Sequence, residues 1–308
     1  MIEVTAAERA AWAEQLANRP SRHAGAGIGG HEHSLAPGGA SESDIEDEPT
    51  EPVDEWDLAS AQVFAVASGK GGVGKSTITA NLAAALAQKG LKVGVLDADL
   101  NGFSMPRMLG VQGAACKSEG SIVAPEAHGV KMMSLGMFTT GQEAVIWRGP
   151  VMNRALQQFL TETDWGDLDV LFVDLPPGTG DVAISIAKLL PQAEILLVTT
   201  PQLVAAEVAA RAGAMTLHTH QRVRGIIENM AYFDLPDGTR ITPFGEGGGT
   251  QVAQTLTKQL GQPTELLAQI PLSDEVRKGS DAGIPVVISD PDSAPARAVQ
   301  TLANLLVE

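Results

Sequence analysis

The residues with the clearest chemical meaning stand together as Gly69-Lys70-Gly71-Gly72-Val73-Gly74-Lys75-Ser76. They fit the pattern G-x-x-x-x-G-K-[ST], in which glycines let backbone N–H groups turn toward phosphate oxygens. In this pattern Lys75 reaches the terminal phosphates and the Ser76 hydroxyl coordinates Mg²⁺. The segment, with Thr77 directly after it, predicts a phosphate-binding loop, and Lys70 adds a second positive charge.

Two acidic segments follow later apolar runs and supply the other groups that phosphoryl transfer needs. They are Asp97-Ala98-Asp99 and the segment from Asp174 to Asp181. Transfer to water requires a metal clamp, an oriented water and positive charge over the transition state. Asp174 fits the Mg²⁺-side carboxylate, Asp99 could orient or deprotonate the water, and Lys70 could supply the charge. With Ser76 these aspartates are the candidate metal ligands, although a strand-end aspartate can instead cap a helix. We interpret Asp97 as structural, holding the glycine loop by hydrogen bonds.

The elements on either side of the glycine loop must position it. Residues 62–67 form an apolar run of strand length, and residues 77–89 carry apolar side chains at helical spacing. Strand, loop and helix in this order are the context that the pattern requires. The start of the helix then presents unpaired N–H groups and a positive dipole end to the phosphates.

From residue 62 onward the chain alternates strands with helices. Strands are predicted over residues 92–97, 170–174, 194–199, 223–228 and 266–270, and helices over residues 151–163, 181–190, 203–220, 250–260 and 294–306. Because the strands are mostly apolar throughout, we expect an α/β P-loop fold with a mostly parallel sheet and helices on both faces. Ligands of such sheets lie at the carboxyl ends of strands, where Asn229 could read a purine edge with its amide.

The first 61 residues differ in composition from the rest. Residues 1–60 carry 13 acidic and three basic side chains, and Gly, Ser and Pro are frequent up to residue 52. We expect a short helix over residues 6–19 and a disordered acidic tail after it. His23, His31 and His33 are interpreted as part of this linker rather than as a metal tract. The predicted division is therefore residues 1–61 for the tail and 62–308 for the P-loop domain.

Composition also limits the classes of partner. The net charge of −16 argues against a nucleic-acid partner, because such binding depends on Lys and Arg neutralising phosphates. The apolar runs are far shorter than the roughly 20 residues of a membrane helix. No signal segment opens the chain, so we expect a cytoplasmic protein without a membrane partner. The single cysteine, Cys116, excludes an internal disulfide, and we interpret it as an incidental small residue.

Taken jointly, these residues resemble the Mrp/NBP35 family of P-loop ATPases, which have a deviant Walker A loop and are related to MinD, ParA and the nitrogenase iron protein. The resemblance spans about residues 62–290. Beyond the glycine loop it rests on Asp97-Ala98-Asp99, Ser104-Met105-Pro106-Arg107-Met108-Leu109-Gly110, Trp147-Arg148-Gly149-Pro150, Asp174-Leu175-Pro176-Pro177-Gly178-Thr179-Gly180-Asp181, Thr199-Thr200-Pro201-Gln202, Glu228-Asn229-Met230 and Phe244-Gly245.

The resemblance implies an ATPase that uses Mg²⁺ and converts ATP and water to ADP and phosphate. It further implies a homodimer in which Lys70 reaches the ATP held by the partner subunit. Asp99 would lie in the first switch and the segment from Asp174 to Asp181 in the second. Asn229 would lie at the adenine, with residues 271–274 closing over the base.

The resemblance also implies a carrier or assembly factor for iron–sulfur clusters, with apo iron–sulfur proteins as clients. Family members commonly hold the cluster through a C-x-x-C pair after the Asn-Met segment. Here that place reads Tyr232-Phe233-Asp234-Leu235-Pro236-Asp237-Gly238, without a cysteine. A four-iron cluster takes about four thiolates, of which two copies of Cys116 would supply half. Asp234 and Asp237 could bind a metal, but Pro-Asp-Gly favours an ordinary turn.

Two other functions share the glycine loop. One is a MinD- or ParA-like ATP-driven dimer switch that recruits a partner without carrying a cluster. Its membrane-bound form is disfavoured because residues 294–308 contain one basic residue, Arg297, and so lack a basic amphipathic helix. The other is a small-molecule kinase, which Lys70 and the segment from Asp174 to Asp181 disfavour because both are typical of dimeric ATPases. The carrier is the favoured hypothesis.

Overall fold

The computed structural model describes residues 60–99, 102, 104–113, 115–118, 121–138 and 149–308. The predicted helix over residues 6–19, the three histidines of the tail and the Trp147-Arg148 pair lie outside the described residues. The division of the chain at residue 61 therefore stays a prediction.

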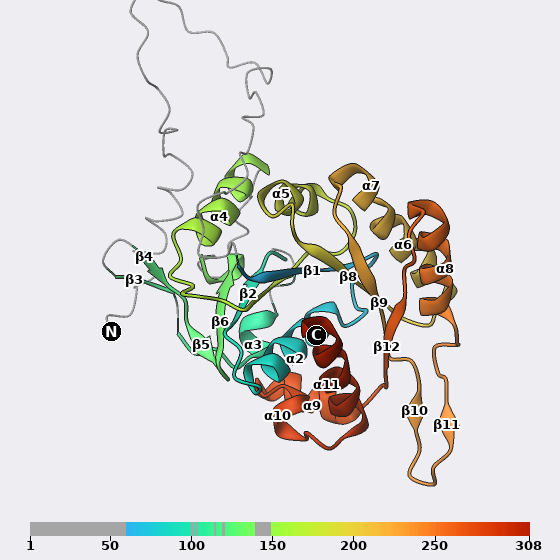
Figure 1. Cartoon of the computed structure of the whole chain (residues 1–308). Coiled ribbons are helices and arrows are strands. Elements are labelled where there is room, and N and C mark those ends of the chain that lie inside the picture. Colours follow the sequence, from blue (N-terminus) through green and yellow to red (C-terminus); the bar gives the residue numbers. More distant parts are fainter. Residues whose placement is uncertain (1–59, 100–101, 103, 114, 119–120, 139–148) are drawn as a thin grey trace, which may run out of the picture.

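An eight-stranded sheet forms the centre of the described part (Figure 1). Its order is β12-β9-β8-β1-β7-β2-β6-β5, and all neighbouring pairs are parallel except β5 with β6. The strands are β1 (Gln62–Ser68), β2 (Val93–Asp97), β5 (Glu126–Ala127), β6 (Val130–Ser134), β7 (Val170–Asp174), β8 (Glu194–Thr199), β9 (Val223–Asn229) and β12 (Leu266–Ile270). The mostly parallel sheet predicted from the apolar strands is confirmed.

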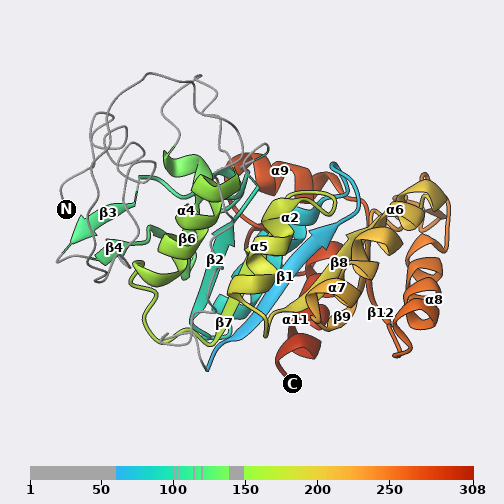
Figure 2. The same cartoon turned by 90° about the horizontal axis from the view of Figure 1, so that it is seen from above.

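Helices cover both faces of this sheet, as the views in Figure 1 and Figure 2 show. One face carries α4 (Gly149–Thr161), α5 (Asp181–Leu189), α6 (Leu203–Ala214), α7 (Thr216–Thr219) and α8 (Gly248–Leu260). The other carries α2 (Lys75–Ala87), α3 (Met105–Met108), α9 (Asp274–Ala282), α10 (Val286–Ser289) and α11 (Ala294–Val307). Among the described helices, none has the length and apolar character needed to cross a membrane.

Each face of the sheet has its own apolar core, because successive side chains of a strand point to opposite faces. In β1, Val63 and Ala65 belong to the core under α4 to α8, whereas Phe64 belongs to the core under α2 and α11. Phe64 stacks on Phe172 of the neighbouring strand β7, with ring centroids 5.6 Å apart. Burial on both faces explains why these strands are apolar throughout rather than alternating.

Several elements have no clear signal in the sequence. Strand β6 reads Val-Lys-Met-Met-Ser, in which Val130 is the only β-branched residue and no residue is aromatic. A small hairpin of β3 (Cys116–Ser118) and β4 (Ser121–Val123) lies outside the main sheet. The helix predicted over residues 203–220 is divided into α6 and α7. At the division Thr216 Oγ1 donates to the Gly213 carbonyl at 2.7 Å, and such a bond competes with helical hydrogen bonding.

Replacing Phe172 with alanine tests the importance of the stacked pair in the core. Phe172 is fully buried, so Phe172→Ala should lower the free energy of unfolding by about 3–5 kcal/mol. Urea denaturation followed by circular dichroism measures this value. Ile241→Ala is the control, because that side chain is 41% exposed and its loss should change the free energy of unfolding by about 0.5 kcal/mol or less.

Candidate functional site

The glycine loop lies between the end of β1 at Ser68 and the start of α2 at Lys75, as the sequence predicts. Gly72 and Gly74 have φ angles of 79° and 86°, a region that favours glycine. The loop borders a cleft of about 460 Å³, lined by all residues from 70 to 77 together with Asp99, Ser104, Met108 and Pro177. The predicted loop and one predicted acidic residue therefore share one cleft.

Asp174 lies directly behind the loop and is fully buried. Its Oδ2 lies 2.8 Å from Lys75 Nζ and accepts a hydrogen bond from Ser76 Oγ at 2.5 Å. Its Oδ1 accepts one from Thr79 Oγ1 at 3.0 Å. The structure thus brings together three residues that the sequence singled out, and adds Thr79. The only signal for Thr79 in the sequence is its place four residues after Lys75, on the same face of α2.

Asp99 stands on the cleft side of the same group. Its Oδ2 lies 3.9 Å from Lys75 Nζ, so Lys75 is close to both predicted catalytic aspartates. Ser76, Asp99 and Asp174 offer only oxygen donors, which are the ligands that Mg²⁺ prefers. This donor set therefore fits a magnesium ion bound together with phosphates.

Asp97 has a structural contact, although not the one expected. Its carboxylate accepts hydrogen bonds from Ser134 Oγ at 3.0 Å and from the Asp99 backbone N–H at 3.1 Å, rather than from the glycine loop. Burial, and secondly the negative charge of Asp174, raise the pKa of Asp97 to about 7. Asp97 and Asp174 are register partners on β2 and β7, which explains their proximity.

Lys70 lies at the rim of the cleft, on the side of α6. Its Nζ donates to Gln202 Oε1 at 3.0 Å. The preceding residue, Gly69, is in close contact with α6, since a Cβ there would lie 2.4 Å from backbone atoms of Val208 and Ala209. The sequence analysis predicts that the positive charge of Lys70 acts on the transition state. In this structure that charge is hydrogen-bonded to the N-cap residue of α6 in the same subunit.

Asn229 ends β9 beside the loop. Its side-chain Nδ2 donates to the Val73 carbonyl at 2.9 Å, and a Cβ on Gly74 would lie 2.1 Å from the same nitrogen. In this structure the amide therefore braces the glycine loop, a role without a signal in the sequence. The predicted contact of Asn229 with adenine stays a prediction.

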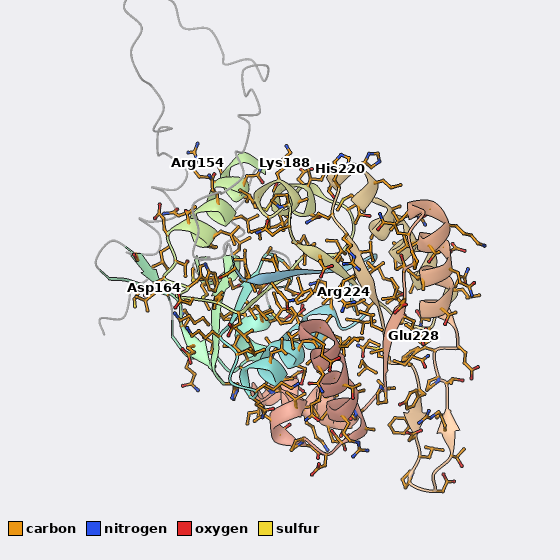
Figure 3. All side chains as sticks on the ribbon, viewed as in Figure 1. Arg154, Asp164, Lys188, His220, Arg224 and Glu228 are labelled. Carbon is orange, nitrogen blue, oxygen red and sulfur yellow. The ribbon has the colours of Figure 1, made fainter. Side chains whose placement is uncertain are left out.

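Glu228, the residue before Asn229 and labelled in Figure 3, connects β9 with α8 and β12. Its carboxylate accepts hydrogen bonds from the Gly249 backbone N–H at the start of α8 and from Gln269 Nε2 in β12. The end of β9 therefore fixes the start of α8 on one side and the glycine loop on the other.

The segment without the cysteine pair forms a hairpin that projects beyond the sheet (Figure 1). Its strands are β10 (Phe233–Asp234) and β11 (Arg240–Ile241). Arg240 donates to both carboxylate oxygens of Asp234, at 2.8 and 3.0 Å, and lies 3.5 Å from the centre of the Tyr232 ring. Asp237 accepts from the Thr239 backbone N–H, which confirms the predicted turn. No group of three or more His, Cys, Asp or Glu within the described residues is placed to hold a metal ion.

Comparison with protein families and curated sequences gives one consistent result. A family model described as the NUBPL iron-transfer P-loop NTPase matches residues 59–307. The iron-sulfur cluster carrier protein of Mycobacterium tuberculosis is 56% identical over 243 residues, which cover 79% of this chain and 64% of that protein. The protein of the same name from Synechocystis is 45% identical over 250 residues, 79% of this chain and 69% of that protein. The chain therefore spans about two thirds of the length of such relatives.

Solved structures agree with this result. A nucleotide-binding protein of Archaeoglobus fulgidus, solved in complex with ADP, is 35% identical with a TM-score of 0.63 and covers 76% of this chain and 90% of that one. The septum site-determining protein MinD of Pyrococcus horikoshii, complexed with Mg-ADP, is 26% identical with a TM-score of 0.59 and covers 80% and 96%.

Gly74→Ala tests the fit between the loop and Asn229. A Cβ at this position meets the Asn229 amide, so nucleotide affinity should fall about tenfold or more, equivalent to about 1.4 kcal/mol. Titration with a fluorescent ADP analogue measures the affinity. Gly90→Ala is the matched control, because Gly90 has the same φ of 86° but open space around its Cβ position. Because Gly90 follows the end of α2 and does not line the cleft, an equal loss of affinity in both variants would indicate general damage to the fold rather than the contact with Asn229.

Asp97→Asn tests the raised pKa. The folded protein binds this proton more tightly than the unfolded chain, whose reference pKa is 3.8, so the contribution of Asp97 to stability is lost as pH rises toward and beyond 7. Between pH 4 and pH 8 the variant should gain stability relative to the unchanged protein by on the order of 2–4 kcal/mol. Urea denaturation at a series of pH values, without nucleotide, measures this difference. A difference independent of pH would contradict the assignment.

Proposed function

Because the chain belongs to the family of NUBPL iron-transfer P-loop NTPases, we propose that it is an ATP-hydrolysing, homodimeric carrier or assembly factor for iron–sulfur clusters. The observation that carries the ATPase part is the contact of Lys75 and Ser76 with Asp174 behind a glycine loop. The names of the mycobacterial and cyanobacterial relatives support the cluster part. Apo iron–sulfur proteins would be the clients.

ATP would bind along the loop, with backbone N–H groups and the start of α2 facing its phosphates. Lys75 lies beside Asp174 and Asp99 and would turn toward the terminal phosphates. Ser76 and Asp174, with Asp99 on the cleft side, would hold Mg²⁺. When bound, the ion neutralises charge on the phosphate oxygens.

Asp99 would orient the attacking water, because it lines the cleft close to Lys75. Lys70 would act on the ATP of the partner subunit, where a positive charge stabilises the transition state. This assignment is supported by the place of Lys70 at the rim of the cleft, beside exposed residues of α6. Hydrolysis would then depend on the pairing of two copies.

The cluster would be cargo, and its attachment must differ from a C-x-x-C pair. The sequence has one cysteine, and the segment after Asn229 is closed by the Asp234–Arg240 ion pair. A four-iron cluster takes about four thiolates, so a dimer of this chain would need ligands from a client or a small molecule. An assembly factor that drives transfer by hydrolysis needs no such ligands of its own.

Substitution of the two loop lysines separates catalysis from binding. Lys70→Ala should lower the hydrolysis rate by about 10³-fold or more while ATP binding remains, since a cation supplied by a partner acts on the transition state. Lys75→Ala should weaken ATP binding itself, because its charge contacts ground-state phosphates. Phosphate release and nucleotide titration measure the two effects. Unchanged turnover of Lys70→Ala would refute the action of Lys70 on the partner's ATP.

A dilution series tests whether ATP hydrolysis depends on dimerisation. If hydrolysis requires a dimer, the turnover per subunit should rise with protein concentration until the dimer is saturated. Phosphate release across a dilution series gives this profile. A flat profile at concentrations where sedimentation shows monomers would contradict a dimeric active site.

Anaerobic reconstitution distinguishes the carrier from the assembly factor. Iron and sulfide analysis of the reconstituted protein should give at least one cluster per dimer if the chain carries clusters directly. Less than one cluster per dimer, with normal phosphate release, would leave the assembly role and exclude direct carriage. Absence of ATP hydrolysis under all conditions would exclude both.

A further inference from the structure

The contact between Lys70 and Gln202 joins two residues 132 positions apart in the chain. Gln202 occupies the N-cap position of α6, where a polar side chain often accepts from the first helical N–H groups. Here its side chain makes no such bond, and its Oε1 accepts from Lys70 Nζ at 3.0 Å instead. The Gln202 amide oxygen therefore accepts its hydrogen bond from Lys70 of the glycine loop and not from the N–H groups of α6.

Backbone packing brings these two side chains together. Gly69 lies directly on α6, where a Cβ would come within 2.4 Å of backbone atoms of Val208 and Ala209. Gly248, at the start of α8, lies equally close to the segment before Gln202, since its Cβ would be 2.5 Å from the Pro201 carbonyl oxygen. Both ends of the contact are thus held by close backbone packing.

The surface beside this contact is open and apolar. Leu203 and Val204 follow Gln202 directly and are 58% and 70% exposed, more than any other large apolar side chain in the described part of the chain. Pro177, which lines the same cleft, is also exposed. A second copy that approaches Lys70 would therefore meet the segment that carries Gln202.

We propose that Gln202 is a positioning residue that retains Lys70 on its own subunit and releases it when a second copy binds. The inference rests on the proposed function, in which Lys70 acts on the partner's ATP. Lys70 Nζ must leave Gln202 Oε1 to reach a phosphate across the interface, because the backbone of Gln202 is fixed by α6 and α8. The contact within one subunit and the contact between subunits therefore exclude each other.

Such a competition weakens dimerisation more strongly as the fraction of released Lys70 becomes smaller. The apparent dissociation constant equals the intrinsic constant divided by the fraction of the competent state. A hydrogen bond from an ammonium to a neutral amide, at a partly exposed site, corresponds to about a two- to tenfold effect on this fraction. Removal of the Gln202 amide should therefore lower the dimer dissociation constant, and a stronger hydrogen-bond acceptor at this position should raise it.

Two substitutions of Gln202 should have opposite effects on dimerisation with a non-hydrolysable ATP analogue. Gln202→Ala should lower the dimer dissociation constant about two- to tenfold. Gln202→Glu should raise it at about 50 mM salt, and the effect should shrink at about 500 mM salt because an ion pair is screened. Analytical ultracentrifugation over a concentration series measures these constants. A residue with only a structural role would not produce opposite signs or this dependence on salt.

Gln254→Glu is the matched control. Gln254 is an exposed glutamine of α8, so the substitution adds the same negative charge away from Lys70. It should leave the dissociation constant within about twofold, since exposed single charges have small effects. Thermal melting and ADP titration of each variant confirm that the fold and the loop are intact.

The outcomes separate this inference from the proposed function. If the unchanged protein forms no dimer with the analogue at any concentration, the proposed homodimer itself is wrong. If it forms a dimer but Gln202→Ala weakens pairing, Gln202 contacts the partner or its nucleotide and does not retain Lys70. Unchanged dimer dissociation constants for both Gln202 variants would also show that Gln202 does not retain Lys70. That result would leave the proposed dimeric ATPase in place.

Discussion

The buried ion pair between Lys75 and Asp174 is the interaction on which the rest of the site depends. Lys75 Nζ lies 2.8 Å from a carboxylate that is fully buried. Charges removed from water are costly unless they are paired and hydrogen-bonded. Hydroxyl groups of Ser76 and Thr79 complete the surroundings of Asp174. Because the lysine and both hydroxyls belong to the start of α2, this pair fixes the phosphate loop against β7.

The order of the strands determines which carboxylates meet. Strand β7 lies between β1 and β2, so Asp174 is the register partner of Val66 on one side and of Asp97 on the other. A second negative charge beside a buried carboxylate is unfavourable. The raised pKa of Asp97 follows mainly from its burial and then from this neighbour. Asp97 therefore connects β2 to β6 by accepting a hydrogen bond from Ser134. Asp99, two residues later, lines the cleft instead.

The nucleotide site and the projecting hairpin are parts of one continuous segment. Asn229 braces Val73, and the backbone N–H of Ala231 donates to the Ile270 carbonyl. The chain then enters the hairpin that Asp234 and Arg240 close. The place where the resemblance implies a C-x-x-C pair is therefore taken by a hairpin without a cysteine.

The sequence by itself determined the glycine loop, the six apolar parallel strands around it and the acidic residues at their ends. These features follow from local rules, because phosphate binding needs contiguous glycines and a buried parallel strand must be apolar. These rules did not predict strand β6, because it forms a strand through its pairing with β2 and not through its composition. Only the tertiary structure decided that Asn229 braces Val73 and that Gln202 receives Lys70. Such contacts join residues more than 130 positions apart, and they depend on backbone packing that no local pattern records.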